Sequence, residues 1–127
     1  MSTTRWEVEL YRRADDRCPT LDLLADLPAG DRVRALNKLA LLEEHGHTLR
    51  RPHVDYLQDD IWELRVSGQA GPLRLLYFFF DGTKIVVTHG FVKKGNVRDK
   101  DRVPQGEMAR AGQTRAEYLA RQQGGKR

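Results

Sequence analysis

Positively charged side chains recur along three strand-like runs in the second half of the chain. The runs cover residues 62–66, 73–80 and 84–91. They carry Arg65 and Arg74, and then His89, Lys93 and Lys94 at or just beyond the end of the third run. Arginine grips phosphate through paired hydrogen bonds, lysine supplies a point charge, and histidine can move a proton near neutral pH. On the rigid support of paired strands, this set has the charge needed to bind a polyphosphate chain and the acid-base groups needed to cleave it.

Each of these residues also has a purely structural interpretation. Arg65 can be a solvated strand residue, because charged side chains are mostly exposed. Arg74 lies inside an apolar octet and must reach solvent, a ligand or a carboxylate such as Glu63, since a buried unpaired guanidinium is costly. His89 can bond to the backbone, and the two lysines can protect a sheet edge. Their expected coincidence on one sheet favours the functional interpretation.

The charge distribution locates the basic surface in the second half of the chain. The 127 residues have a formal net charge of +4. Residues 1–64 hold nine Lys/Arg and 13 Asp/Glu, a net −4, whereas residues 65–127 hold 13 and five, a net +8. The second half is therefore the candidate for contact with nucleic acid.

Composition points to one cytoplasmic domain without a cofactor. The length suits a single modest core, and no apolar run approaches the ~20 residues of a membrane span. The N-terminus lacks a signal-peptide pattern, and the single cysteine, Cys18, agrees with a reducing cytosol. No glycine-rich phosphate loop, paired-cysteine site or Ser/His/Asp arrangement is present. We expect no metal and no cofactor.

Hydrophobic periodicity predicts one strand and two helices in the first half. Residues 6–10 alternate as a half-buried edge strand. A short helix follows around 21–27, and a longer helix is expected over 31–45 with an apolar stripe of Val33, Leu36, Leu39, Ala40 and Leu42, ending at Gly46. Residues 48–60 are expected to be irregular.

The second half predicts three antiparallel strands and a last helix. Residues 67–72 suggest an open loop, whereas Asp81-Gly82 is the preferred pair for a tight primed hairpin turn. A helix over 107–123 follows a charged segment, with Gly112 costing it about 1 kcal/mol relative to Ala. The predicted class is α+β, in the order β-α-α-β-β-β-(α), with helices on one face of an antiparallel sheet. We expect a domain at 1–103, and a C-terminal helix and disordered tail at 104–127.

Several short motifs together resemble a known family. They read PHVDYL from Pro52, WELR from Trp62, RLLY from Arg74, HGFVKK from His89, and Pro104-x-x-Glu107-Met108-x-x-Ala111. In combination these residues, between about 32 and 119, resemble the RelE/HigB-like toxins of bacterial type II toxin-antitoxin systems, especially the phage-associated branch. Asp60-Ile61 and Leu73 depart from the common pattern.

The resemblance implies a small RelE-like domain that cleaves mRNA on the ribosome and is neutralised by an antitoxin, often a helix-turn-helix protein. Operator DNA would be bound only through the antitoxin complex. Position by position, Arg65 and Arg74 match the strand arginines of the family. His89, Lys93 and Lys94 match its last strand and the exit from it.

Our leading hypothesis is a metal-independent endoribonuclease in which the RNA 2′-hydroxyl attacks the adjacent phosphate. Arg65 and Arg74 would hold that phosphate, and His89 or Lys94 would transfer protons. Lys93, Lys94 and Arg98 would contact the RNA backbone. A ParE-like inhibitor that binds DNA gyrase is one alternative. A non-catalytic RNA-binding domain with strongly salt-dependent affinity is another.

Overall fold

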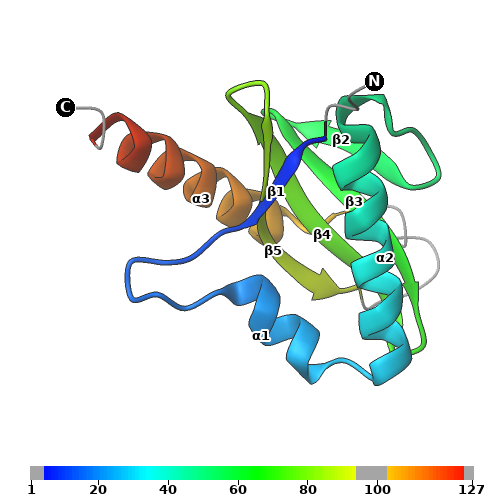
Figure 1. The fold of residues 1–127 in the computed structure, drawn as a ribbon. Helices are drawn as coiled ribbons and strands as arrows, with labels where there is room; N and C mark the ends of the chain where they lie inside the picture. Colours follow the sequence, from blue (N-terminus) through cyan, green and yellow to red (C-terminus); the bar gives the residue numbers. More distant parts are fainter. Residues whose placement is uncertain (1–4, 94–102, 125–127) are drawn as a thin grey trace.

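A computed structural model describes residues 5–93 and 103–124 (Figure 1). The described part contains a five-stranded sheet and three α-helices, which confirms the α+β class. The strands are β1 Glu7–Leu10, β2 Val54–Gln58, β3 Ile61–Gly68, β4 Gly71–Phe80 and β5 Lys84–Val92. The helices are α1 Pro19–Asp26, α2 Ala29–His45 and α3 Gln105–Gly124, with a short 3-10 helix η1 at Gly46–Thr48.

The sheet has the strand order β1-β5-β4-β3-β2. We had predicted a purely antiparallel sheet, and this prediction is wrong for one pair of strands. Strands β2 to β5 are joined by successive hairpins, so each is antiparallel to its neighbour. Strand β1 instead pairs parallel to β5. A long connection through helices frees a strand from hairpin geometry, and α1 and α2 provide such a connection between β1 and the other strands.

Strand β2 occupies a segment for which we had predicted irregular structure. It pairs with β3 through a turn at Asp59-Asp60, whose φ angles are 52° and 66°. Tyr56 accepts a hydrogen bond from the Asp60 backbone N–H at 3.1 Å and stabilises the turn. The pair Asp-Asp is a weaker hairpin signal than Asn-Gly or Asp-Gly, and the pairing shifts register between Tyr56 and Gln58, which obscures the alternation of side chains.

The two following hairpins differ in how well their turns were predicted. Asp81 and Gly82 have φ angles of 60° and 68°, which confirms the primed turn. The predicted open loop over 67–72 is wrong, because β3 and β4 continue to Gly68 and Gly71. The Asp31 carboxylate accepts hydrogen bonds from the N–H groups of Gln69 at 2.7 Å and Ala70 at 3.0 Å, and so holds the turn closed.

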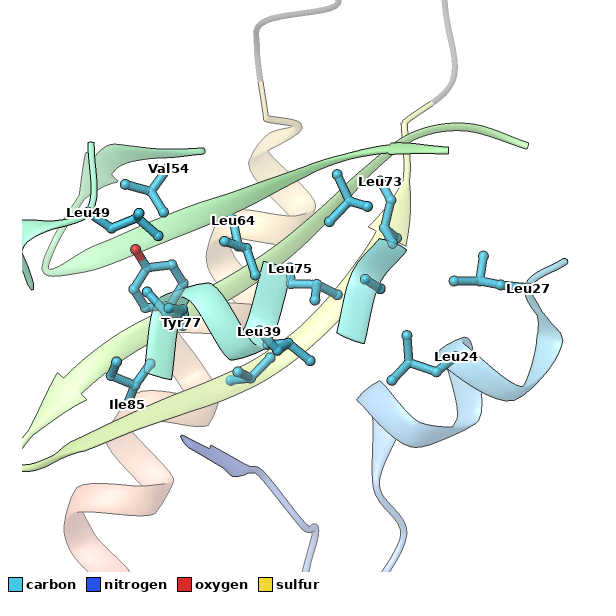
Figure 2. Packing of buried hydrophobic residues seen from close by; sticks show 14 residues of the cluster. Leu24, Leu27, Leu39, Leu49, Val54, Leu64, Leu73, Leu75, Tyr77 and Ile85 are labelled. Carbon is cyan, nitrogen blue, oxygen red and sulfur yellow. The ribbon is translucent and has the colours of Figure 1, made fainter. Parts of the chain in front are cut away.

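Helices α1 and α2 cover one face of the sheet (Figure 1). Figure 2 shows Leu24 of α1 and Leu27, just after α1, at one end of this core and Leu49 and Val54 at the other. The predicted stripe of α2 is wrong in part, since Val33 and Leu36 are 54% and 50% exposed and Ala40 is also exposed. The buried stripe of α2 consists of Asp31, Ala35, Leu39 and Leu42, because the helix turns its Asp31 side toward the hairpin.

Helix α3 lies on the opposite face, which corrects the prediction of helices on one face only. Its Met108, Ala111 and Tyr118 are buried with Leu76 and Phe78 of β4. Strand β4 is apolar on both faces, because Leu75 and Tyr77 point to α2 while Leu76 and Phe78 point the other way. The second face of the sheet is therefore also apolar, and α3 shields it from water.

None of the helices in the described residues has the length and apolar composition of a membrane span.

Gly46 ends α2 as predicted, and its conformation places Trp6 against the helix end. Gly46 has φ 54° and ψ −126°, a region that residues with a Cβ avoid. A Cβ there would lie 1.9 Å from Trp6 Nε1. The indole can pack directly on the backbone because this position has no side chain.

Substituting Gly46 should therefore destabilise the protein. For Gly46→Ala we expect a loss of roughly 2 kcal/mol or more in the free energy of unfolding, measured with urea, from backbone strain and displacement of Trp6. Gly112→Ala is the matched control, since its Cβ would meet no atom within 4 Å in α3. The control should gain about 1 kcal/mol from helix propensity. Equal effects of the two substitutions would contradict this account.

The hydrogen bonds that the Asp31 carboxylate accepts from the turn between β3 and β4 should make the stability of the protein depend on pH. Hydrogen bonds from the backbone of Ala70 and Gln69 lower the pKa of Asp31 below its ordinary value of about 3.9. The contribution of Asp31 to the free energy of unfolding is therefore fully present above its ordinary pKa. It is lost as the pH falls through the lower pKa of Asp31 in the folded state. We expect Asp31→Asn to lower the Tm at neutral pH, and the difference from wild type to shrink in acid. A difference that stays constant from about pH 7 to pH 3 would refute this role.

Candidate functional site

The strand register brings three of the predicted cations to one end of one sheet face. Arg65 and Arg74 are direct partners across β3 and β4, and Arg74 is also paired with Phe91 of β5. Directly paired side chains lie on the same face of a sheet. Just after β5, the Lys93 backbone N–H donates to the Pro72 carbonyl at 2.6 Å, which holds Lys93 at the same end.

A buried carboxylate, Glu63, lies among these cations. Glu63 Oε1 is 3.3 Å from Arg74 Nε, and Glu63 Oε2 is 3.8 Å from Arg65 Nε. Burial raises the pKa of Glu63, while the positive charges of Arg74, Arg65 and Lys93 act to lower it. Because the carboxylate sits between the guanidinium groups, it offsets their mutual repulsion and fixes their directions. The group Glu63, Arg65, Arg74 and Lys93 is called the cation cluster below.

The two arginines differ in how far they reach the surface. The Arg74 side chain is 7% exposed, is paired with Glu63, and donates to its own neighbour's carbonyl, Leu73 O, at 3.1 Å. The sequence had left solvent, a ligand or a carboxylate such as Glu63 as partners of Arg74, and the contact with Glu63 is present. The Arg65 side chain is 24% exposed. Arg65 is therefore the arginine placed to meet a ligand directly, and Arg74 stands behind it.

His89 is held beneath α3, one row of side chains away from the paired arginines. It lies opposite Leu76, whereas Phe91 lies opposite Arg74. Its Nε2 is 2.9 Å from Glu107 Oε1, and its Nδ1 is 3.1 Å from Thr88 Oγ1. Burial lowers the pKa of His89, although the Glu107 carboxylate acts to raise it. A neutral ring donates to Glu107 from Nε2, while the Thr88 hydroxyl beside Nδ1 donates to the Leu76 carbonyl at 3.3 Å.

A cavity of about 510 Å³ opens beside the arginines at the edge of β3. Its lining includes Arg65, Arg74 and a residue that sequence reasoning did not select, Lys38 of α2. Lys38 Nζ is 2.8 Å from His53 Nδ1, and burial lowers the pKa of Lys38. A signal was present, because Lys38 lies three residues after Ala35 and four before Leu42, on the side of α2 that faces the sheet.

Lys94 and Arg98 lie outside the described residues. Within residues 5–93 and 103–124, no group of three or more His, Cys, Asp or Glu side chains is placed to hold a metal ion.

Comparison with known proteins identifies the family. Residues 22–116, most of the chain, match the family described as phage derived protein Gp49-like (DUF891). No match was found among the curated proteins. The family match supports the RelE-like resemblance and leaves the HigB-like branch a prediction. With its five-stranded α+β fold, the chain belongs to the Gp49-like family of phage-derived proteins, a family of RelE-like toxins in toxin-antitoxin systems.

Proposed function

We propose that this protein is the toxin of a type II toxin-antitoxin system and that it inhibits translation by cleaving mRNA on the ribosome. The observation that carries the proposal is the cation cluster, in which Arg65, Arg74 and Lys93 meet around Glu63 beside a cavity. Membership of the Gp49-like family supports a toxin role. The site offers fixed positive charge to a phosphodiester and a rigid sheet to hold it.

In the proposed reaction, the 2′-oxygen of one nucleotide attacks the adjacent phosphorus. The O2′–P bond forms, the P–O5′ bond breaks, and the products are a 2′,3′-cyclic phosphate and a 5′-hydroxyl. Arg65 contacts the phosphate as negative charge grows on its oxygens, and Arg74 keeps Arg65 and Glu63 in place behind it. Preorganised cations of this kind stabilise the transition state more than the substrate.

Two groups are candidates to move the proton from the 2′-hydroxyl to the leaving 5′-oxygen. His89 is 1% exposed and bonded to Glu107, so it can reach RNA only after Glu107 and the start of α3 release the ring. Lys94 is the alternative, two residues beyond β5. The choice between His89 and Lys94 stays open, as it was from the sequence.

The proposed partners follow from the toxin role. They are mRNA, the ribosome and a cognate antitoxin of the helix-turn-helix type, in the cytoplasm. Operator DNA would be contacted only by the antitoxin complex. A small helix-turn-helix gene beside the gene for this protein would support the assignment directly.

Replacing Arg65 tests the proposal. We expect Arg65→Ala to reduce mRNA cleavage in a reconstituted translation reaction by about 100-fold or more, because it removes a charge that meets the transition state. The Tm should change little, since the side chain is partly exposed. Lys84→Ala is the control, because Lys84 begins β5, at the end of the strand far from Lys93 and the cation cluster. Its Nζ is paired with Glu9 at 3.8 Å. Undiminished cleavage by Arg65→Ala would remove Arg65 from the mechanism.

Induction in living cells separates this function from the alternatives. The proposal predicts prompt arrest of protein synthesis by the wild type and none by Arg65→Ala. DNA damage with continuing translation would instead indicate a gyrase inhibitor. Salt-sensitive RNA binding without broken phosphodiesters would indicate a binding domain.

A further inference from the structure

A second cavity, of about 390 Å³, lies between α2 and the edge of β3. It is lined by Arg34, Asn37, Lys38, Leu41, Val66 and Ser67. Three of these residues, Lys38, Val66 and Ser67, also line the cavity beside Arg65 and Arg74. The two cavities therefore adjoin, with Lys38 on their common wall.

The two cavities differ in chemistry. The cavity at the cation cluster carries the guanidinium groups of Arg65 and Arg74. The second has aliphatic walls at Leu41 and Val66 and is also lined by Asn37 of α2. Arg34 closes it near the hairpin, because its Nε donates to the Ser67 carbonyl at 3.0 Å. A phosphate suits the first cavity, and a flat apolar group with a hydrogen-bonding edge suits the second.

We infer that the cavity between α2 and β3 binds the base of a nucleotide next to the phosphate held by the cation cluster, and that Asn37 reads the edge of this base. The inference rests on the proposed function and gives its site a preference among bases. Unpaired RNA offers this combination of groups, since its bases are free to turn away from the strand and into a protein pocket. An amide can donate and accept at once, so Asn37 can distinguish one base from another.

Lys38 links the two halves of this site. Its Nζ is bonded to His53 Nδ1, which fixes the ammonium group on the shared wall. A positive charge there lies between the place for the phosphate and the place for the base. Continuity with the cation cluster favours RNA over an apolar peptide as the ligand. An apolar peptide has no negative charge to pair with the three cations Lys38, Arg65 and Arg74 that line the adjoining cavity.

The test measures binding of short 2′-O-methyl RNA strands, which cannot be cleaved, at low ionic strength. The strands carry A, C, G, U or an abasic residue at one position. The wild type should prefer one base and bind the abasic strand roughly tenfold more weakly. Asn37→Ala should lose the preference among bases while keeping affinity for the abasic strand. It should also fold well, because alanine favours the helix.

Matched variants distinguish RNA binding at these two cavities from nonspecific electrostatic binding elsewhere on the surface. Lys38→Gln should weaken binding of all strands and lower the slope of affinity against salt by about one, as loss of one phosphate contact does. Lys84→Gln and Gln123→Ala, which change similar groups away from both cavities, should leave base preference and abasic-strand affinity as in the wild type.

Two results would overturn the inference. One is equal binding of the base-bearing and abasic strands by the wild type. The other is an unchanged base preference in Asn37→Ala, and weaker binding of the cognate antitoxin by that variant would then assign the cavity to a protein partner. Cleavage on translating ribosomes that still needs Arg65 would, in either case, leave the proposed function intact.

Discussion

A buried negative charge allows the positive side chains to gather on this sheet. Arg65 and Arg74 occupy directly paired positions of neighbouring strands, where like charges repel. Glu63 lies within 3.8 Å of both and is itself almost fully buried. Burial raises the pKa of Glu63, although the charges of Arg74, Arg65 and Lys93 act to lower it. A phosphate arriving at Arg65 would meet a guanidinium already oriented by Glu63, which reduces the side-chain entropy lost on binding.

Helix α3 and the cation cluster occupy different parts of the sheet face that lies opposite α1 and α2. Helix α3 covers the apolar part of this face, where Phe78 and Tyr118 pack edge to face with ring centroids 5.6 Å apart. The cation cluster lies beyond it, at the end of the sheet where β3 and β4 form their hairpin. His89 of β5 lies between the two parts, because its ring is hydrogen-bonded to Glu107 of α3. A movement of the start of α3 would therefore change the exposure of His89.

Sequence reasoning predicted what local patterns control and missed what depends on distant contacts. Alternation and the Asp81-Gly82 turn predicted the strands that carry Arg65, Arg74 and His89, and Glu63 was foreseen as a partner of Arg74. The tight turn after β3 was not predictable, since its support, Asp31, lies 38 residues before Gln69. The contact between His89 and Glu107 likewise depends on where α3 docks. Lys38 was within reach of sequence reasoning, because it shares the helix face of buried neighbours.

The hairpin support and the site are mechanically connected. Asp31 binds the turn between β3 and β4, and Arg34 binds both Asp31, at 2.8 Å, and the Ser67 carbonyl. Arg65 and Ser67 are two residues apart on β3, so a hairpin that shifted would carry Arg65 with it. The rigidity that places the guanidinium therefore comes from the first turns of α2, on the opposite face of the sheet. Because a misplacement of about 1 Å can cost 100-fold in rate, Asp31 and Arg34 would affect the proposed cleavage reaction as well as stability.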